Sequence, residues 1–257
     1  MSLSLAHLPR SLFWLAGAFV LTILAISLGL HGALDRMVAV LLWREVPCWG
    51  RTMSAQASVV FAAELSLLYA LGLGFICLRA RQPLAAGWIL FLLLAGVGLE
   101  VAFKYNFTHA APSAFFETVS RPPCGQAGPS YPLTVVPTPS SLPSGYSLRA
   151  AYFCLLVAAM VGGRWPAWRW PAWLGFGAIA LVAGASRVTV GWHWPSDVVA
   201  GLLIGACAAI LVAAQARNVV WLGARGGSRG GSRANRGATP RGRRGSGSRT
   251  PTRRPRR

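Results

Sequence analysis

The chain has 257 residues, of which 54% are hydrophobic and 12% are charged, and its formal net charge is +19. A soluble domain carries about 25% charged residues. The deficit is larger over most of the chain, because residues 217–257 hold 13 of the 25 basic side chains and none of the six acidic ones. This composition excludes a soluble globular enzyme, because so apolar a body can be buried only in lipid.

Six segments are long and apolar enough to cross a membrane, which takes about 20 residues. In chain order they are residues 11–30, 54–78, 84–103, 146–163, 172–190 and 197–216. The sequence therefore predicts an all-α, polytopic membrane protein with six transmembrane helices. The first segment is too long for a removable signal peptide, so we expect it to be retained as a helix.

The connections between these segments differ in charge. Basic residues fall mainly on one side, at Arg10, Arg79, Arg81, Arg164, Arg169 and in the C-terminal tail. Because basic residues near helix ends stay in the cytoplasm, we expect a plasma membrane protein with both termini cytoplasmic. The loops 31–53, 104–145 and 191–196 would then face outward.

The chain divides into residues 1–222, the membrane domain, and residues 223–257, a tail with repeated Gly-Gly-Ser-Arg and almost no apolar residues. Such a composition predicts disorder. At the inner membrane surface, anionic lipids attract each basic residue by about 1 kcal/mol. The expected partners of the tail are therefore anionic membrane lipids, and nucleic acid is the less favoured alternative. The sequence does not specify an oligomeric state.

Two of the five cysteines lie in outward loops. Cys48 and Cys124 are in a compartment that permits oxidation, and we predict a disulfide between them. The other three cysteines, Cys77, Cys154 and Cys207, lie inside predicted helices and are expected to be small core residues.

Polar side chains gather where the fifth and sixth predicted helices meet. The sequence there reads Ser186-Arg187, five residues, His193, three residues, Asp197. A neutral imidazole attacks phosphorus and forms a covalent phosphohistidine, and a carboxylate one helical turn away holds its other ring nitrogen. Arginine offers a bidentate fork to phosphate oxygens. Each residue alone has a simpler interpretation, as an interfacial histidine, a helix cap or a snorkelling arginine, but together they favour phosphate chemistry.

These residues resemble the third motif of the type 2 phosphatidic acid phosphatase superfamily, Ser-Arg-x5-His-x3-Asp, which is complete at residues 186–197. The second motif, Pro-Ser-Gly-His, is similar to Pro143-Ser144-Gly145-Tyr146. The first, Lys-x6-Arg-Pro, is similar to Lys104 followed after six residues by Ala111-Pro112. The resemblance covers residues 104–197 by motif, and the six-helix layout extends it to most of the chain.

The resemblance implies an active site at the extracytoplasmic face that hydrolyses a lipid phosphate. It implies that His193 is the nucleophile and Asp197 its partner. It further implies that the substrate phosphate is bound by Lys104, Ser144, Gly145 and Arg187. Members of this type need no metal, so no cofactor is expected.

The two incomplete motifs change the expected chemistry. In the family the histidine of the second motif protonates the leaving group, whereas Tyr146 stands there in this chain. A phenol, with a pKa of about 10, is a poorer acid near neutrality than an imidazole at about 6.5. An alkoxide leaving group needs a proton, but a phosphate, with its second pKa of about 6, leaves without one. If active, the enzyme is therefore expected to prefer a polyprenyl diphosphate over a monoester such as phosphatidic acid.

Four further residues are auxiliary candidates. His109 could supply the missing proton, although a solvated loop residue is the simpler interpretation. Arg121 or Arg149 could bind phosphate in place of the motif arginine, which is absent at Ala111. Glu100, one turn before Lys104, either positions the lysine or neutralises it.

Two other functions remain open. One is a catalytically impaired relative that binds lipid phosphates, as the residues at positions 111 and 146 suggest. The other is a phosphotransferase that passes the phosphoryl group from His193 to an acceptor hydroxyl instead of water.

Overall fold

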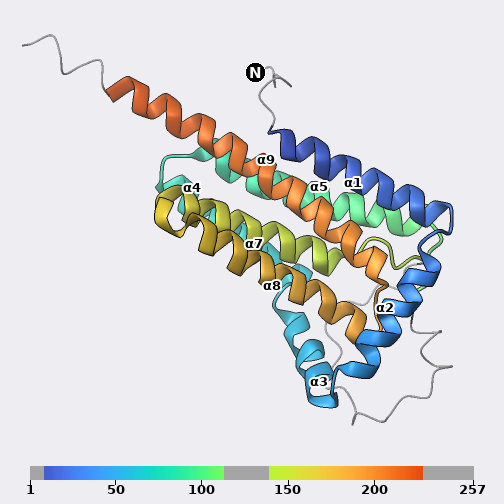
Figure 1. Cartoon of the computed structure of the whole chain (residues 1–257). Helices are drawn as coiled ribbons and strands as arrows, with labels where there is room; N and C mark the ends of the chain where they lie inside the picture. The colour runs from blue at the N-terminus through green and yellow to red at the C-terminus, as the bar shows by residue number, and fades with distance from the viewer. Residues whose placement is uncertain (1–8, 113–138, 228–257) are drawn as a thin grey trace, which may run out of the picture. The chain divides into compact units, whose positions relative to one another are not determined.

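The computed structural model describes residues 9–112 and 139–227, and within these ranges the secondary structure is helical (Figure 1). The helices are α1 (Arg10–Ser27), α2 (Gly32–Glu45), α3 (Cys48–Gln56), η2 (Ala57–Val59), α4 (Ala63–Arg79), α5 (Pro83–Asn106), α7 (Gly145–Arg164), η3 (Pro166–Trp168), α8 (Arg169–Thr189) and α9 (Pro195–Gly227). The predicted all-α fold is confirmed.

Among the described residues, five helical segments are long and apolar enough to span a membrane, which supports the prediction of a membrane protein. They are Arg10–Ser27, Pro83–Asn106, Gly145–Arg164, Pro166–Thr189 and Pro195–Gln215. The predicted span at residues 54–78 is instead divided between the end of α3, η2 and α4. With 17 residues, α4 is about 25 Å long at 1.5 Å per residue, somewhat short of a hydrocarbon core of about 30 Å.

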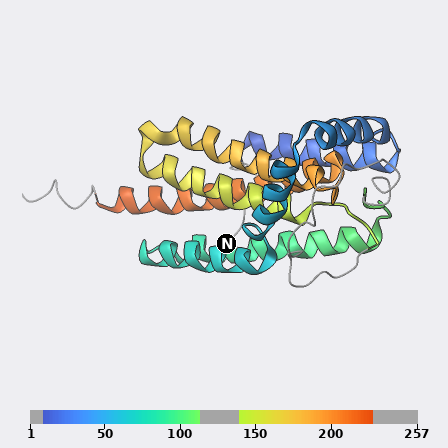
Figure 2. The same ribbon diagram turned by 90° about the horizontal axis from the view of Figure 1, so that it is seen from below.

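The core lies around α7, which buries most of its first turns. Figures 1 and 2 show α4 and α5 side by side on one side of α7, and α8 packed along the other. Two glycines let α9 cross α7 closely. A Cβ at Gly201 would collide with the Ser144 carbonyl oxygen, and one at Gly205 with the Leu148 carbonyl oxygen. Small residues at helix crossings permit this backbone approach in membrane proteins.

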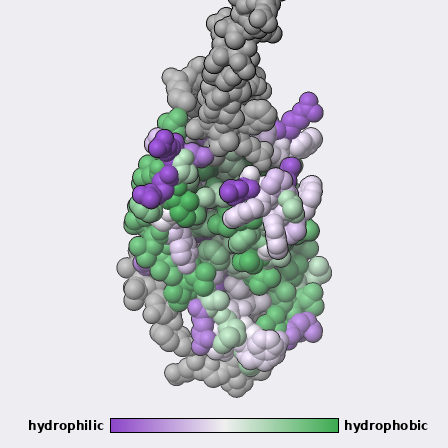
Figure 3. All heavy atoms as spheres, turned by 90° about the vertical axis from the view of Figure 1, so that its left-hand side faces the viewer, coloured by the Kyte–Doolittle hydropathy of each residue, from purple (hydrophilic) through white to green (hydrophobic). Residues whose placement is uncertain are grey.

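The two ends of residues 1–219 differ in character. One end carries the α4–α5 and α7–α8 connections, with Arg79, Arg81, Arg164 and Arg169. Figure 3 looks onto this end, where hydrophilic residues stand among hydrophobic ones. The tryptophans Trp165, Trp168 and Trp170 are exposed there, as expected at a membrane interface. The other end gathers the α1–α2 turn, the end of α5 and the starts of α7 and α9.

The predicted outer loop 31–53 contains two helices, α2 and α3, which sequence reasoning missed. A loop was expected there because residues 31–53 lie between two apolar segments. Tertiary packing stabilises α2, because its Ala39 is buried against Val188 and Val198. The longer predicted loop, 104–145, begins later than expected, since α5 continues to Asn106.

The chain separates into two units, Met1–Val219 and Val220–Arg257. The predicted domain boundary at residue 222 falls within α9, which continues to Gly227. The rest of the tail lies outside the described residues, so its predicted disorder stays a prediction.

Candidate active site

The three predicted motifs meet at the end of the molecule that faces away from the arginine-rich connections. The end of α5, the start of α7, the end of α8 and the start of α9 supply the side chains. Three contacts join these helices: Arg149 to Glu100, Arg187 to Tyr146, and the Ser144 amide to the Asp197 carbonyl. Residues up to 97 positions apart in the sequence, from Glu100 to Asp197, thus form one site.

A tight turn between α8 and α9 holds His193. Gly191 has a φ of 75°, a conformation that costs glycine little. The His193 amide donates to the Arg187 carbonyl oxygen at 3.3 Å. Asp197 then reaches back and accepts a hydrogen bond from the Trp194 amide at 2.9 Å, which satisfies a donor at the start of α9.

His193 faces Asp197 without a hydrogen bond. Its Nδ1 lies 3.6 Å from Asp197 Oδ2, longer than an N–H···O hydrogen bond of about 2.7–3.2 Å. Nδ1 is buried and has no hydrogen-bond partner among the described residues. The predicted pair is therefore adjacent, but a small movement of the ring is needed to close it.

Arg187 is almost completely buried, with 1% of its surface exposed. Its guanidinium lies 3.9 Å from the centre of the Tyr146 ring and 5.1 Å from that of Trp192. Nη2 donates to the Ser54 carbonyl oxygen at 2.8 Å. Aromatic rings stabilise a buried cation through its interaction with their negative faces. The arginine is thus held rigidly by three elements of the fold.

Glu100 joins two cations. Its Oε1 accepts from Lys104 Nζ at 2.7 Å, and its Oε2 accepts from Arg149 Nη1 at 3.0 Å. Arg149 Nε also donates to the Phe61 carbonyl oxygen at 3.0 Å. The expected i, i+4 pair of Glu100 and Lys104 is present, and Arg149 joins it.

Ser144 and Gly145 form the start of α7. Ser144 Oγ accepts hydrogen bonds from the Ser147 amide at 3.4 Å and from Ser147 Oγ at 2.9 Å, so it caps the helix. The position of a Cβ on Gly145 is already occupied by the Glu100 carboxylate. Glycine is therefore required there for a packing reason, and Glu100 lies at the positive end of the α7 dipole.

The Tyr146 hydroxyl is hydrogen-bonded to the backbone of η2. The hydroxyl donates to the Ala57 carbonyl oxygen at 3.0 Å, while the ring lies under Arg187. The Tyr146 ring thus supports Arg187, and the catalytic role of Tyr146 stays a prediction.

His109 is not a solvated loop residue, and that interpretation was wrong. Its side chain is 12% exposed, and its Nδ1 donates to Asp197 Oδ1 at 2.9 Å. Burial lowers the pKa of His109, but the hydrogen bond to Asp197 and the charges of Asp197 and Asp35 outweigh it and raise the pKa above its usual value. Asp197 therefore faces two imidazoles.

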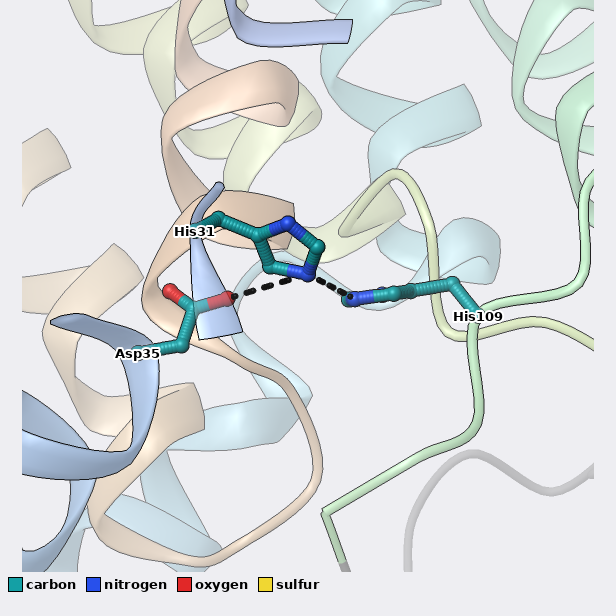
Figure 4. Close-up of side chains that lie close together, drawn as sticks. All are labelled: His31, Asp35 and His109. Atoms are coloured by element: carbon teal, nitrogen blue, oxygen red, sulfur yellow. Dashed lines mark hydrogen bonds and ion pairs between the residues drawn. The ribbon is translucent and has the colours of Figure 1, made fainter. Parts of the chain in front are cut away.

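Two residues beside His109 were missed by sequence reasoning. His31 Nε2 lies 3.0 Å from His109 Nε2 and 3.9 Å from Asp35 Oδ2 (Figure 4). Asp35 is 4% exposed and accepts hydrogen bonds from the Ser196 amide and hydroxyl. The i, i+4 spacing of His31 and Asp35 could have indicated the pair, but their contact with His109 has no local pattern in the sequence.

The sequence model of the PAP2 superfamily matches residues 85–221, which is more than half of the chain. The chain belongs to the PAP2 superfamily. The match contains every residue from Lys104 to Asp197 on which the resemblance was based. The family and the helical fold together support a membrane lipid phosphatase.

A solved structure has the same fold as this PAP2 superfamily member. It is the crystal structure of the first transmembrane PAP2 type phosphatidylglycerolphosphate phosphatase from Bacillus subtilis. The TM-score is 0.65 at 19% sequence identity, and the alignment covers 81% of this chain and 96% of the other. A comparison with curated proteins found no match.

Two predictions about this PAP2 superfamily member fall partly outside the described residues. Arg121 lies outside them. Cys48 is disulfide-bonded, whereas Cys77, Cys154 and Cys207 are free. The predicted partner of Cys48 is Cys124, which also lies outside the described residues, so this pairing stays a prediction.

Proposed function

We propose that the chain is a membrane phosphatase that removes phosphate from a lipid phosphate or diphosphate through a phosphohistidine at His193. The observation that carries this proposal is that His193 lies beside Asp197, while Arg187, Lys104 and Arg149 lie at the same end of the helices. A nucleophile, its carboxylate partner and several phosphate-binding cations are the parts that phosphoryl transfer needs.

The proposed reaction has two steps. The lone pair of His193 Nε2 attacks phosphorus, the N–P bond forms, and the P–O bond to the lipid breaks. Asp197, 3.6 Å from Nδ1, closes onto that nitrogen and stabilises the positive charge that develops on the ring. Water then attacks the phosphohistidine, which releases inorganic phosphate and regenerates the imidazole.

The cations have different tasks in this proposal. Arg187 is fixed by Tyr146, Trp192 and the Ser54 carbonyl, so its guanidinium is preorganised for the phosphoryl oxygens. Lys104 and Arg149 are neutralised in part by Glu100. Two cations on one carboxylate leave net positive charge for a phosphate, and Arg149 takes the role of the motif arginine that is absent at Ala111.

The position of the Tyr146 hydroxyl supports a diphosphate substrate. The hydroxyl is bound to the Ala57 carbonyl, so the residue at the place of the family's acid donates its proton elsewhere. An alkoxide, whose parent acid has a pKa near that of water at about 15.7, leaves poorly without an acid. A phosphate leaving group, with a pKa of about 6, needs none. We therefore propose that a polyprenyl diphosphate is hydrolysed in preference to a phosphate monoester.

The charge of the helix connections supports an extracytoplasmic site in the plasma membrane. The end opposite the site carries Arg79, Arg81, Arg164 and Arg169, and basic connections stay in the cytoplasm. Both termini would then be cytoplasmic, and the substrate would reach the site from the outer leaflet.

The test is phosphate release by purified protein in detergent micelles. Phosphatidic acid, phosphatidylglycerol phosphate and a prenyl diphosphate are compared at matched concentrations, with His193→Ala as control. The proposal expects release that depends on His193 and is fastest with the diphosphate. A faster reaction with phosphatidic acid would overturn the preference, and equal release by His193→Ala would overturn the mechanism.

A further inference from the structure

His31, Asp35 and His109 form a compact group next to the proposed catalytic residues. Figure 4 shows both rings and the carboxylate turned toward one point, from the α1–α2 turn, the first turn of α2 and the segment after α5. Their ligand atoms all lie within 4.8 Å of one another. None of the three is among the proposed nucleophile and phosphate contacts, although His109 contacts Asp197.

The hydrogen bonds of the two rings fix their tautomers. His109 Nδ1 is 2.9 Å from a carboxylate oxygen of Asp197, and His31 Nδ1 is 3.4 Å from the carbonyl oxygen of Ala25. Both oxygens are acceptors, so each Nδ1 carries a hydrogen. In the neutral rings each Nε2 therefore has a lone pair. These two Nε2 atoms face each other at 3.0 Å, which is a hydrogen-bond distance if one ring carries an additional proton. Between two neutral rings the lone pairs repel unless a cation lies between them.

The surroundings match those of a metal-binding histidine pair. Metal-bound histidines usually donate their other ring N–H to a carboxylate or a backbone carbonyl, as His109 does to Asp197 and His31 does to Ala25. Asp35 is also held, by the amide and hydroxyl of Ser196 at 2.9 and 2.6 Å. The three side chains are thus oriented by groups outside the cluster.

The charge balance favours a cation. Asp35 and Asp197 are buried, with 4% and 0% of their surface exposed. In the described part of the chain, their ion pairs are all with histidines, His31, His109 and His193. Buried carboxylates are stable when they are paired or when they coordinate a metal. A divalent ion between the rings would compensate both charges.

We propose that His31, Asp35 and His109 bind a first-row transition cation of the Zn²⁺ type. Zinc binds imidazole nitrogen at about 2.0–2.1 Å, so two nitrogens on one tetrahedral ion are separated by about 3.3–3.4 Å. The observed separation of the Nε2 atoms is 3.0 Å, so the two rings would move slightly apart to hold the ion. Asp35 Oδ2, at 3.9 Å from His31 Nε2, needs only a small rotation. Two imidazoles and one carboxylate suit zinc better than Mg²⁺, which prefers oxygen ligands.

The cation is proposed as a clamp and is separate from the phosphoryl-transfer chemistry, which needs no metal. It would tie the α1–α2 turn to the segment after α5 and, through the His109–Asp197 hydrogen bond, to the first turn of α9. Because the ion would bind the native fold and link three segments, it should raise thermal stability.

The experiment measures zinc uptake by the full chain, purified with a histidine-free tag and stripped with a chelator. After dialysis against low micromolar Zn²⁺, bound metal is determined by mass spectrometry. The wild type is expected to hold about one zinc per chain and to unfold several degrees higher than the stripped protein. His31→Gln, Asp35→Asn and His109→Gln should bind at least about tenfold more weakly, and excess Mg²⁺ should not displace the zinc.

The controls use the remaining histidines. The chain has four, so His7→Gln and His193→Gln complete the set, and both should retain the metal. Retention of zinc by His193→Gln, a variant without the proposed nucleophile, separates this test from the test of catalysis.

The proposal is overturned if the wild type takes up no zinc, which would mean that a shared proton alone joins the rings. Loss of zinc in His193→Gln with retention in His31→Gln would also overturn it. If a variant elutes as an aggregate, the proposal is still tested by the zinc uptake of the wild type and by its unfolding temperature with and without zinc.

Discussion

His109 and Asp197, 88 residues apart in the sequence, are joined by a hydrogen bond of 2.9 Å. The same carboxylate lies 3.6 Å from the ring of His193. Asp197 is therefore oriented from one side by His109 and available to the proposed nucleophile on the other. His109, which lies in a segment without regular secondary structure, therefore orients the Asp197 carboxylate on which the proposed mechanism depends.

Replacing His109 should slow the reaction by acting on Asp197. A hydrogen bond to a charged group is worth about 1.5–3 kcal/mol, so its complete loss in the transition state corresponds to roughly 10–100-fold in kcat. We expect His109→Ala to lower kcat within this range and to leave KM nearly unchanged, because His109 is not among the proposed phosphate contacts. The assay is run with a chelator present, so that zinc does not contribute. An unchanged kcat would contradict this role.

Tyr146→Phe should preserve most of the activity. The variant keeps the ring that lies 3.9 Å from the Arg187 guanidinium and removes the hydroxyl bound to Ala57. Removing a neutral hydrogen bond costs about 1 kcal/mol of stability, whereas loss of a general acid costs about 10²–10⁴-fold in rate. Steady-state rates with a prenyl diphosphate distinguish the loss of a structural hydrogen bond from the loss of a general acid. A fall of a hundredfold would assign Tyr146 an acid role.

Tyr146→His restores the residue of the family motif. If the missing acid limits monoester hydrolysis, this variant should accelerate release from phosphatidic acid more than release from a prenyl diphosphate. The measurement is the ratio of kcat/KM for the two substrates, compared with that of the wild type. An unchanged or lower ratio of monoester to diphosphate hydrolysis would argue against the explanation offered for the diphosphate preference.

Gly145→Ala should disrupt the site through packing. The added Cβ would overlap the Glu100 carboxylate and displace it from Lys104 and Arg149. Breaking a buried ion pair costs about 3–5 kcal/mol, so the thermal midpoint should fall clearly, together with activity. Gly98→Ala is the matched control, because a Cβ at Gly98 meets nothing within 4 Å. Equal midpoints for the two variants would show that the Glu100 network adjusts without cost.

Glu100→Gln should strengthen phosphate binding at the expense of stability. The carboxylate holds Lys104 at 2.7 Å and Arg149 at 3.0 Å, and neutralising it leaves both cations available to another anion. We expect the inhibition constant of inorganic phosphate to fall by up to about tenfold, which is equivalent to 1.4 kcal/mol. Glu64→Gln, at the start of α4, is the control. Weaker phosphate inhibition in Glu100→Gln would mean that Glu100 positions Lys104 for the substrate.

The sequence was sufficient for the features that depend on local pattern. Long apolar segments indicated the helices, and the third motif lies within residues 186–197, so one turn and two helix ends place Arg187, His193 and Asp197 together. Helices α2 and α3 were missed because short helices depend on tertiary packing more than on propensity. In α2 this packing is that of Ala39 against Val188 and Val198.

The partners of the site could not be predicted because they come from distant segments. Nothing local to His109 indicates that it meets His31 and Asp197, which lie 78 and 88 residues away. The Tyr146 hydroxyl has its acceptor at Ala57, 89 residues away. The motif comparison identified tyrosine in place of histidine at position 146. It could not predict the acceptor of the hydroxyl, because that contact depends on the packing of α7 beside η2.

The most direct test of the account is to trap the covalent intermediate. The purified protein is mixed with a prenyl diphosphate labelled in its terminal phosphate, quenched within milliseconds and digested, and the labelled peptide is identified by mass spectrometry. The account predicts an acid-labile phosphoryl group on His193 that is absent from His193→Ala. Phosphate release at an undiminished rate by His193→Ala, or a label on another residue, would contradict it.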